Sequence, residues 1–176
     1  MEWLIISYRL PAEPSRHRVA VWRELRRLGA VPLQQATWAV PSRPVFAEGV
    51  QHAVALVERA EGEVVLLRGA PFDDTHAARL ERLFTEAREA EWIEFLSDCD
   101  KLDREITGEI GKEKFTPAEL DEEEQSLERL RRWYREIRAK DVFQAPSAEL
   151  AERRLKACAE TLEEFADRVY EAGGAP

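Results

Sequence analysis

Seven arginines and one histidine near the start of the chain have side chains that can hold an anion. They are Arg9, Arg16, His17, Arg18, Arg23, Arg26, Arg27 and Arg43. Five of the arginines fall within residues 15–28, which contain a single acidic residue. A guanidinium group donates parallel hydrogen bonds that match phosphate and other tetrahedral oxyanions. The segment therefore predicts a DNA- or anion-binding face, to which Arg9 and Arg43 can contribute from strand ends.

The alternative is that these arginines form an ordinary solvated face of a helix. Helical spacing places Val21, Trp22, Leu25 and Leu28 on the inward side and Arg16, Arg23 and Arg27 opposite, with Arg26 at the margin. Residues 1–70 hold nine Lys/Arg and seven Asp/Glu, whereas residues 71–176 hold 17 and 28. The basic first part of an acidic chain favours anion binding, although the solvated face stays open.

No other group of residues has the spacing of a metal, catalytic or cofactor site. Asp73 and Asp74 near His76 are explained by a capped helix start, and the acidic run 121–124 by its place near a helix N-terminus. The glycines are scattered and form no phosphate-binding loop. We therefore expect no metal, no cofactor and no catalytic residue in this chain.

Two cysteines, Cys99 and Cys158, both lie on apolar helical seams. Small buried thiols are common at such positions. If the two helices that carry them are neighbours, the thiols can instead form a redox pair or a soft-metal site. The absence of a CxxC spacing gives this alternative little support.

The first 72 residues predict one small α+β domain. Apolar runs at 3–10, 31–35, 36–40 and 63–68 predict strands. One helix is expected to start at Pro14 and Ser15, with Ser15 as its cap, and to end at Gly29. A second follows Pro44 and ends at Gly62. The order β-α-β-β-α-β is the ferredoxin-like pattern, a four-stranded antiparallel sheet with two helices on one face.

Residues 73–176 predict a helical extension. Apolar residues recur at spacings of three and four from Trp92 to Ile106 and from Leu155 to Val169, and a further apolar face follows Thr116. Thr116 and Ser147 can cap two of these helices, and breaks fall at residues 108–114 and 141–146. Three amphipathic helices with short breaks are expected to pack as an antiparallel bundle.

Composition indicates a cytoplasmic protein that does not enter a membrane. No apolar run approaches the roughly 20 residues of a spanning helix. No basic stretch precedes the first apolar run, which argues against a signal peptide. With two cysteines and no paired spacing, a disulfide framework is not expected.

The stretch YRLPAEPSRHRVAVWRELRRLGAVPLQQATWAVP resembles the N-terminal domain of the chromate resistance protein ChrB family. The downstream segments PFDD and FTPAELDEEEQSLERLRRWYREIRAKDVFQAP and the last amphipathic helix are also similar to that family. The resemblance implies a cytoplasmic, chromate-responsive transcriptional regulator that acts on the promoter of a chromate efflux operon. Longer members of the family carry a second, C-terminal domain, so chromate sensing can belong to that domain rather than to this chain.

A more distant likeness links the first module to the ferredoxin-like module of PaaX, the phenylacetate-degradation repressor, and to the small CRISPR adaptation subunit. Nuclease members of the latter place a metal-binding Asp just after the first strand. The matching position here is Tyr8 or Arg9, and the nearest acidic residue is Glu13. Because metal-assisted hydrolysis needs oxygen ligands, nuclease activity is not expected.

Three functions remain to be distinguished. The first is a regulator, expected to be a homodimer, that binds DNA or an oxyanion such as chromate through its arginine-rich helix. The second is a non-enzymatic interaction or dimerisation module that uses the helical arm. The third is a nuclease or chromate reductase, and a reductase needs a flavin, a metal or a reactive thiol pair that the sequence does not reveal.

Overall fold

A computed structural model of the chain describes residues 1–173 as an α+β structure with a four-stranded antiparallel sheet and five α-helices. Contacts divide the chain into two compact units, residues 1–87 and the residues from 88 onward. The boundary lies inside one long helix. The predicted domain limit at residues 72 and 73 follows the change from strand to helix and stays a prediction. The last three residues of the predicted extension, 174–176, lie outside the described residues.

The sheet of the first unit has the strand order β2-β3-β1-β4, which makes β1 central and β4 an edge strand. Its strands are β1 (Trp3–Arg9), β2 (Val31–Gln34), β3 (Thr37–Pro41) and β4 (Glu63–Gly69). All neighbouring pairs are antiparallel, and Ile6 of β1 lies opposite both Trp38 of β3 and Leu66 of β4. The four predicted strands are confirmed, with their ends displaced by about one residue.

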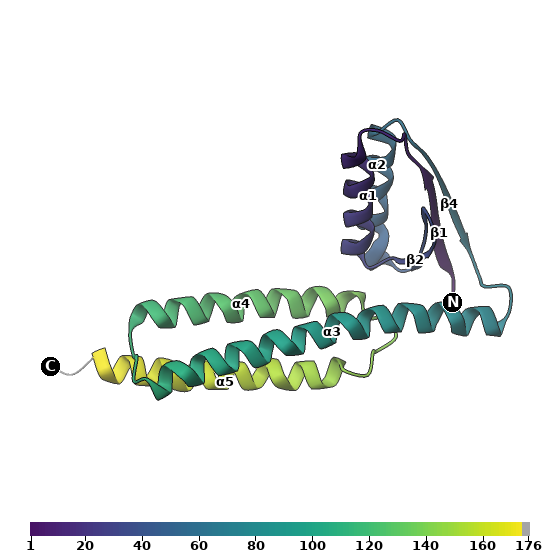
Figure 1. Cartoon of the computed structure of the whole chain (residues 1–176). Helices are drawn as coiled ribbons and strands as arrows, with labels where there is room; N and C mark the ends of the chain where they lie inside the picture. Colours follow the sequence, from purple (N-terminus) through teal and green to yellow (C-terminus); the bar gives the residue numbers. More distant parts are fainter. Residues whose placement is uncertain (174–176) are drawn as a thin grey trace. The chain divides into compact units, whose positions relative to one another are not determined.

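Helices α1 (Ser15–Leu28) and α2 (Ala47–Arg59) cover one face of this sheet (Figure 1). A single 3-10 turn, Pro44–Phe46, precedes α2. Both helices bury apolar side chains of the unit's core, among them Val21, Leu25, Val50 and Val57. The sequence period therefore placed both helices correctly in the chain.

The ends of α1 confirm one sequence prediction and correct another. Gly29 has a φ of 89° and ends the helix, and its N–H donates to the carbonyl oxygen of Arg26 at 3.0 Å. A side chain is strained in this left-handed region, so a glycine suits the position. The predicted Ser15 cap is wrong, because Ser15 is already the first helical residue and follows Pro14 without any side-chain cap.

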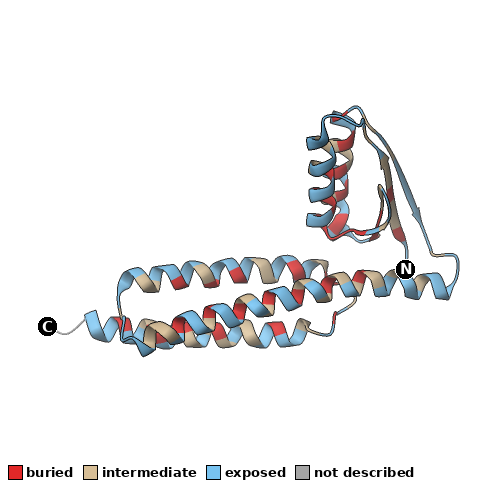
Figure 2. Cartoon of the chain, viewed as in Figure 1, coloured by how far each residue is buried: buried red, intermediate tan, exposed pale blue. Residues whose placement is uncertain are grey.

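The second unit contains most of α3 (Asp74–Gly111), all of α4 (Pro117–Lys140) and α5 (Ala148–Gly173). Buried residues from all three helices form one apolar cluster, visible as red bands in Figure 2. The predicted seams are confirmed, since Trp92, Phe95, Ile106, Leu162 and Phe165 all belong to this cluster.

The helix ends of this unit follow the sequence only in part. The N–H of Glu119 donates to Thr116 Oγ1 at 3.3 Å, which confirms the predicted cap of α4. Helix α3 continues to Gly111, so the predicted break at residues 108–114 begins too early. The hydroxyl of Ser147, predicted to cap α5, donates to Glu89 Oε1 at 2.6 Å, and its role as a cap stays a prediction.

The turn between α4 and α5 is held by a buried carboxylate. Asp141 Oδ2 accepts a hydrogen bond from the indole N–H of Trp92 at 2.9 Å. The same carboxylate accepts from the backbone N–H of Ala145 at 3.0 Å. Asp141 thus joins α3 to the turn, which fixes where α5 begins.

Within residues 1–173, no helix combines the length and the apolar character needed to span a lipid bilayer.

Candidate anion-binding surface on the first helix

The outward side of α1 carries the predicted arginines. Arg16, Arg18, Arg23, Arg26 and Arg27 are all exposed, whereas His17 is half-buried. The inner side of the helix is closed by buried apolar residues, so the charged side chains have only the solvent side available (Figure 2). Arg16, Arg23 and Arg27 share one exposed face of the helix, with Arg26 at its edge. Arg18 is exposed on the far side, about 160° from Arg16 at 100° of rotation per residue.

The arginines differ in how far their charge is already compensated. Among the residues that the structure describes, the guanidinium groups of Arg16 and Arg23 make no hydrogen bond and no ion pair. The guanidinium of Arg18 donates to the backbone carbonyl oxygen of Ala12. Arg16 and Arg23 thus have the full donor capacity of their side chains available for an external anion.

Arg27 is paired with an acidic residue of its own helix. Its Nε donates to Glu24 Oε2 at 3.0 Å, and a terminal nitrogen donates to Glu24 Oε1 at 2.6 Å. His52 of α2 also approaches Glu24, with Nδ1 at 3.2 Å from Oε1. Burial opposes ionisation of Glu24, but the hydrogen bonds from Arg27 and His52 outweigh it and hold the pKa of Glu24 below its usual value. The Glu24 carboxylate therefore compensates much of the charge of Arg27.

Trp22 departs from the sequence prediction. It was assigned to the inward stripe, yet 46% of the residue is exposed. The guanidinium carbon of Arg26 lies 5.3 Å from the centre of its ring, a cation–π contact. At about 100° of rotation per residue, Trp22 falls outside the arc of Val21 and Leu25. The exposed surface therefore combines arginines with an aromatic ring. The sequence signal for this contact is the spacing of four residues between Trp22 and Arg26, which places them side by side on a helix.

Arg9 and Arg43 lie at opposite ends of the sheet. Arg9 is the last residue of β1, and Arg43 follows β3, whose last residue, Pro41, pairs with Trp3 at the start of β1. Seven strand residues separate the two ends by about 20 Å. Both side chains are exposed, but they cannot hold the same small anion.

The two cysteines of the helical unit are brought together. Cys99 of α3 and Cys158 of α5 are fully buried, and Cys158 Sγ donates to the carbonyl oxygen of Cys99 at 3.4 Å. Its hydrogen bond with Cys158, together with burial, raises the pKa of the Cys99 thiol. The same hydrogen bond lowers the pKa of the Cys158 thiol. Because both thiols are fully buried and out of reach of an oxidant, this pair fits the predicted role as core residues better than a redox role.

Comparison with known proteins extends the geometric observations. The chain is 30% identical over 98 residues to Protein ChrB of Cupriavidus metallidurans. The match covers 55% of this chain and 30% of that relative, so the chain spans less than a third of the relative's length. The family described as "Protein ChrB, N-terminal" matches residues 18–175, which is most of the sequence. The chain therefore belongs to the ChrB N-terminal family.

Proposed function

We propose that the exposed surface of α1 binds DNA phosphates and that the chain is the DNA-contacting part of a chromate-responsive transcriptional regulator. The promoter of a chromate efflux operon is its expected target, in the cytoplasm. The single observation that supports DNA contact is the absence of an acidic partner for Arg16 and Arg23 among the described residues. Membership of the ChrB family supports the link to chromate resistance.

The spacing of the arginines favours DNA over a single oxyanion. Arg16 and Arg26 are ten residues apart, which corresponds to about 15 Å along a helix. One chromate ion cannot contact both ends of such a row, whereas successive DNA phosphates can. Arg23 and Arg27, four residues apart on the same helical face, cannot act as a free clamp because Glu24 already binds Arg27. Chromate therefore remains the weaker candidate ligand for this surface.

The test is a salt-dependent titration of promoter DNA. We expect the logarithm of the binding constant to fall linearly with the logarithm of salt concentration, as counterions leave the phosphates. Substituting Arg16, Arg23 and Arg26 together by alanine is expected to reduce the slope by about two to three units, since each phosphate contact contributes about 0.9. Fluorescence anisotropy at several salt concentrations gives both slopes.

A matched triple variant controls for the loss of three positive charges. Arg59, Arg82 and Arg153 are exposed arginines outside both α1 and β4, and their combined substitution by alanine should leave most of the slope intact. An equal loss in both triple variants would contradict binding through α1. Separate titrations with chromate and with sulfate at equal ionic strength distinguish a specific response to chromate from general screening of charge.

Incubation of the DNA with the protein and Mg²⁺ tests the non-enzymatic role, and we expect the DNA to be recovered uncut.

The sheet and helices α1 and α2 of the first unit are proposed to have the ferredoxin-like fold. Helices α3, α4 and α5 are proposed to form an antiparallel extension. The alternation of strands and helices from β1 to β4, together with the strand order β2-β3-β1-β4, supports the first assignment. The short connections at residues 112–116 and 141–147 support the second.

A homodimer is proposed through the edge strand β4. Val65, Leu66 and Leu67 are 55%, 43% and 60% exposed, and an edge strand has backbone groups available for pairing with another strand. The alternative, association through the helical arm, has less support. The apolar seams of α3, α4 and α5 are occupied by their own shared core.

A further inference from the structure

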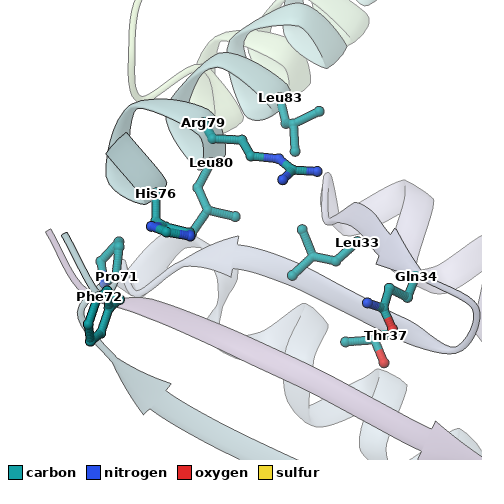
Figure 3. Close-up of a pocket in the computed structure, with 9 residues that line it drawn as sticks. All are labelled: Leu33, Gln34, Thr37, Pro71, Phe72, His76, Arg79, Leu80 and Leu83. Atoms are coloured by element: carbon teal, nitrogen blue, oxygen red, sulfur yellow. The ribbon is translucent and has the colours of Figure 1, made fainter. Parts of the chain in front are cut away.

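The first unit contains a hollow that no sequence pattern indicated. Phe84 of α3 is fully buried and packs edge-on against the rings of Trp3 and Phe46, with 5.9 Å between ring centres in both pairs. This contact packs the first part of α3 against the rest of the first unit. On the N-terminal side of Phe84, a hollow of about 470 Å³ lies between α3 and strands β2 and β3 (Figure 3). Its volume lies within the usual range for small-molecule sites, roughly 300 to 1,000 Å³.

Most of the wall of this hollow is apolar. Leu33 lines it from β2, and Leu80 and Leu83 line it from α3. Pro71 and Phe72, which precede α3, form a further part of the wall, and Phe72 is 92% exposed. An apolar wall open to water favours a ligand that brings an apolar group of its own.

One strong hydrogen-bond donor enters this apolar space. Figure 3 shows the side chain of Arg79 extending from α3 toward the wall that carries Leu33. Within residues 1–173, the guanidinium of Arg79 makes no hydrogen bond and no ion pair. Its donors are therefore available to a ligand in the hollow, and a carboxylate matches their geometry.

The remaining polar groups are consistent with an anionic ligand. The Gln34 amide and the Thr37 hydroxyl line the strand side, and Thr37 Oγ1 also lies 3.2 Å from Ser7 Oγ. His76 is held by Asp73, whose Oδ1 accepts from the His76 backbone N–H at 2.9 Å and lies 2.7 Å from Nδ1. None of the nine lining residues is acidic. Among the lining residues, His76 thus already has the Asp73 carboxylate as its partner, whereas Arg79 has none.

We infer that this hollow binds a small amphipathic organic anion, with its carboxylate on Arg79 and its aromatic or aliphatic part against Leu33, Leu80 and Leu83. An inorganic oxyanion would leave the apolar wall unused. The unpaired guanidinium beside an apolar wall therefore specifies the ligand's chemistry. This site is separate from α1 and does not depend on DNA binding.

The test uses the full chain and 2-naphthoate as the probe, with 2-naphthalenemethanol as an uncharged compound of similar size. Isothermal titration calorimetry should show saturable binding of the carboxylate and binding of the alcohol that is weaker by roughly 10- to 100-fold, the range expected for a lost charged hydrogen bond. Arg79→Ala should weaken naphthoate binding by a similar factor. Leu33→Asp, which puts a carboxylate on the apolar wall and keeps Arg79, should weaken naphthoate binding at least as strongly.

Arg82→Ala is the matched control, because Arg82 lies three residues further along α3 and does not line the hollow. It should bind naphthoate like the unmodified chain, and circular dichroism should show that all variants keep their helices. The inference is overturned if naphthoate does not bind, if the alcohol binds equally well, or if Arg79→Ala and Arg82→Ala weaken binding equally. It is also overturned if Leu33→Asp leaves naphthoate binding unchanged in a folded protein.

Discussion

Glu123 is a buried carboxyl group in an acidic neighbourhood. It belongs to the acidic run at the start of α4, yet it is almost completely buried while its neighbours Asp121, Glu122 and Glu124 are exposed. Burial, followed by the negative charges of Glu105 and Glu122, raises the pKa of Glu123 to about 7. The folded chain therefore binds a proton at this position more tightly than the unfolded chain does.

The sign of this shift predicts how stability depends on pH. The contribution of protonated Glu123 is fully present below the ordinary glutamate pKa and is lost as the pH rises through about 7. Glu123→Gln should therefore stabilise the protein at pH 8 by about 1–2 kcal/mol, with partial solvent screening taken into account. At pH 5 the gain should be small. Urea denaturation at both pH values measures the difference, and Glu122→Gln at the exposed neighbouring position serves as the control.

The sequence identified the arginines of α1 but not which of them are available. Glu24 is buried because Arg27 and His52 both contact it, and His52 comes from α2, far along the chain. No local pattern reveals such a partner. Trp22 was misplaced because its residue type favours the core, whereas its rotational position on the helix places it at the surface. The approach of His52 to Glu24 and the exposure of Trp22 depend on packing that only the structure provides, whereas the spacing of three residues between Glu24 and Arg27 already allowed that pair.

At the scale of elements, periodicity predicted the helices well because their apolar seams are long and regular. The seams of α3 and α5 are buried as expected from their spacing. The hollow beside Arg79 was not predictable, because it depends on Phe84 packing against Trp3 and Phe46. Helix ends were the weakest predictions, since Ser15 is already inside its helix and α3 continues to Gly111 through the start of the predicted break.

The Asp141 carboxylate leads to a prediction about helix packing. Asp141→Ala leaves the indole N–H of Trp92 and the backbone N–H of Ala145 without their acceptor. Because hydrogen bonds to charged groups contribute about 1.5–3 kcal/mol each, we expect a loss of roughly 3 kcal/mol in the free energy of unfolding. Asp141→Asn should lose less, since an amide oxygen can still accept one of the bonds.

Urea denaturation followed by tryptophan fluorescence measures these losses. Asp167→Ala on α5 removes an exposed carboxylate that has no hydrogen bond or ion pair among the described residues, and it should be nearly neutral. A loss at Asp141 no larger than the loss at Asp167 would contradict the bridging role.

At the scale of the whole molecule, the proposed dimer depends on the edge strand. Leu67→Lys introduces a charge on β4 that should oppose strand pairing between two copies. Light scattering after size exclusion should give twice the 20.3 kDa chain mass for the unmodified protein and the single-chain mass for this variant. Ile93→Lys changes an equally exposed apolar residue of α3 and should remain dimeric. A monomeric unmodified protein would rule the dimer out.

The position of Phe84 sets the shortest fragment of the first unit that keeps its aromatic core complete. A fragment that stops after the last strand would leave the rings of Trp3 and Phe46 uncovered, because their aromatic neighbour belongs to the following helix. Such a fragment is prone to aggregation, since it exposes large apolar rings to water. A fragment extended to residue 87 keeps this ring cluster complete, so recombinant versions of the sheet unit should include the first part of α3.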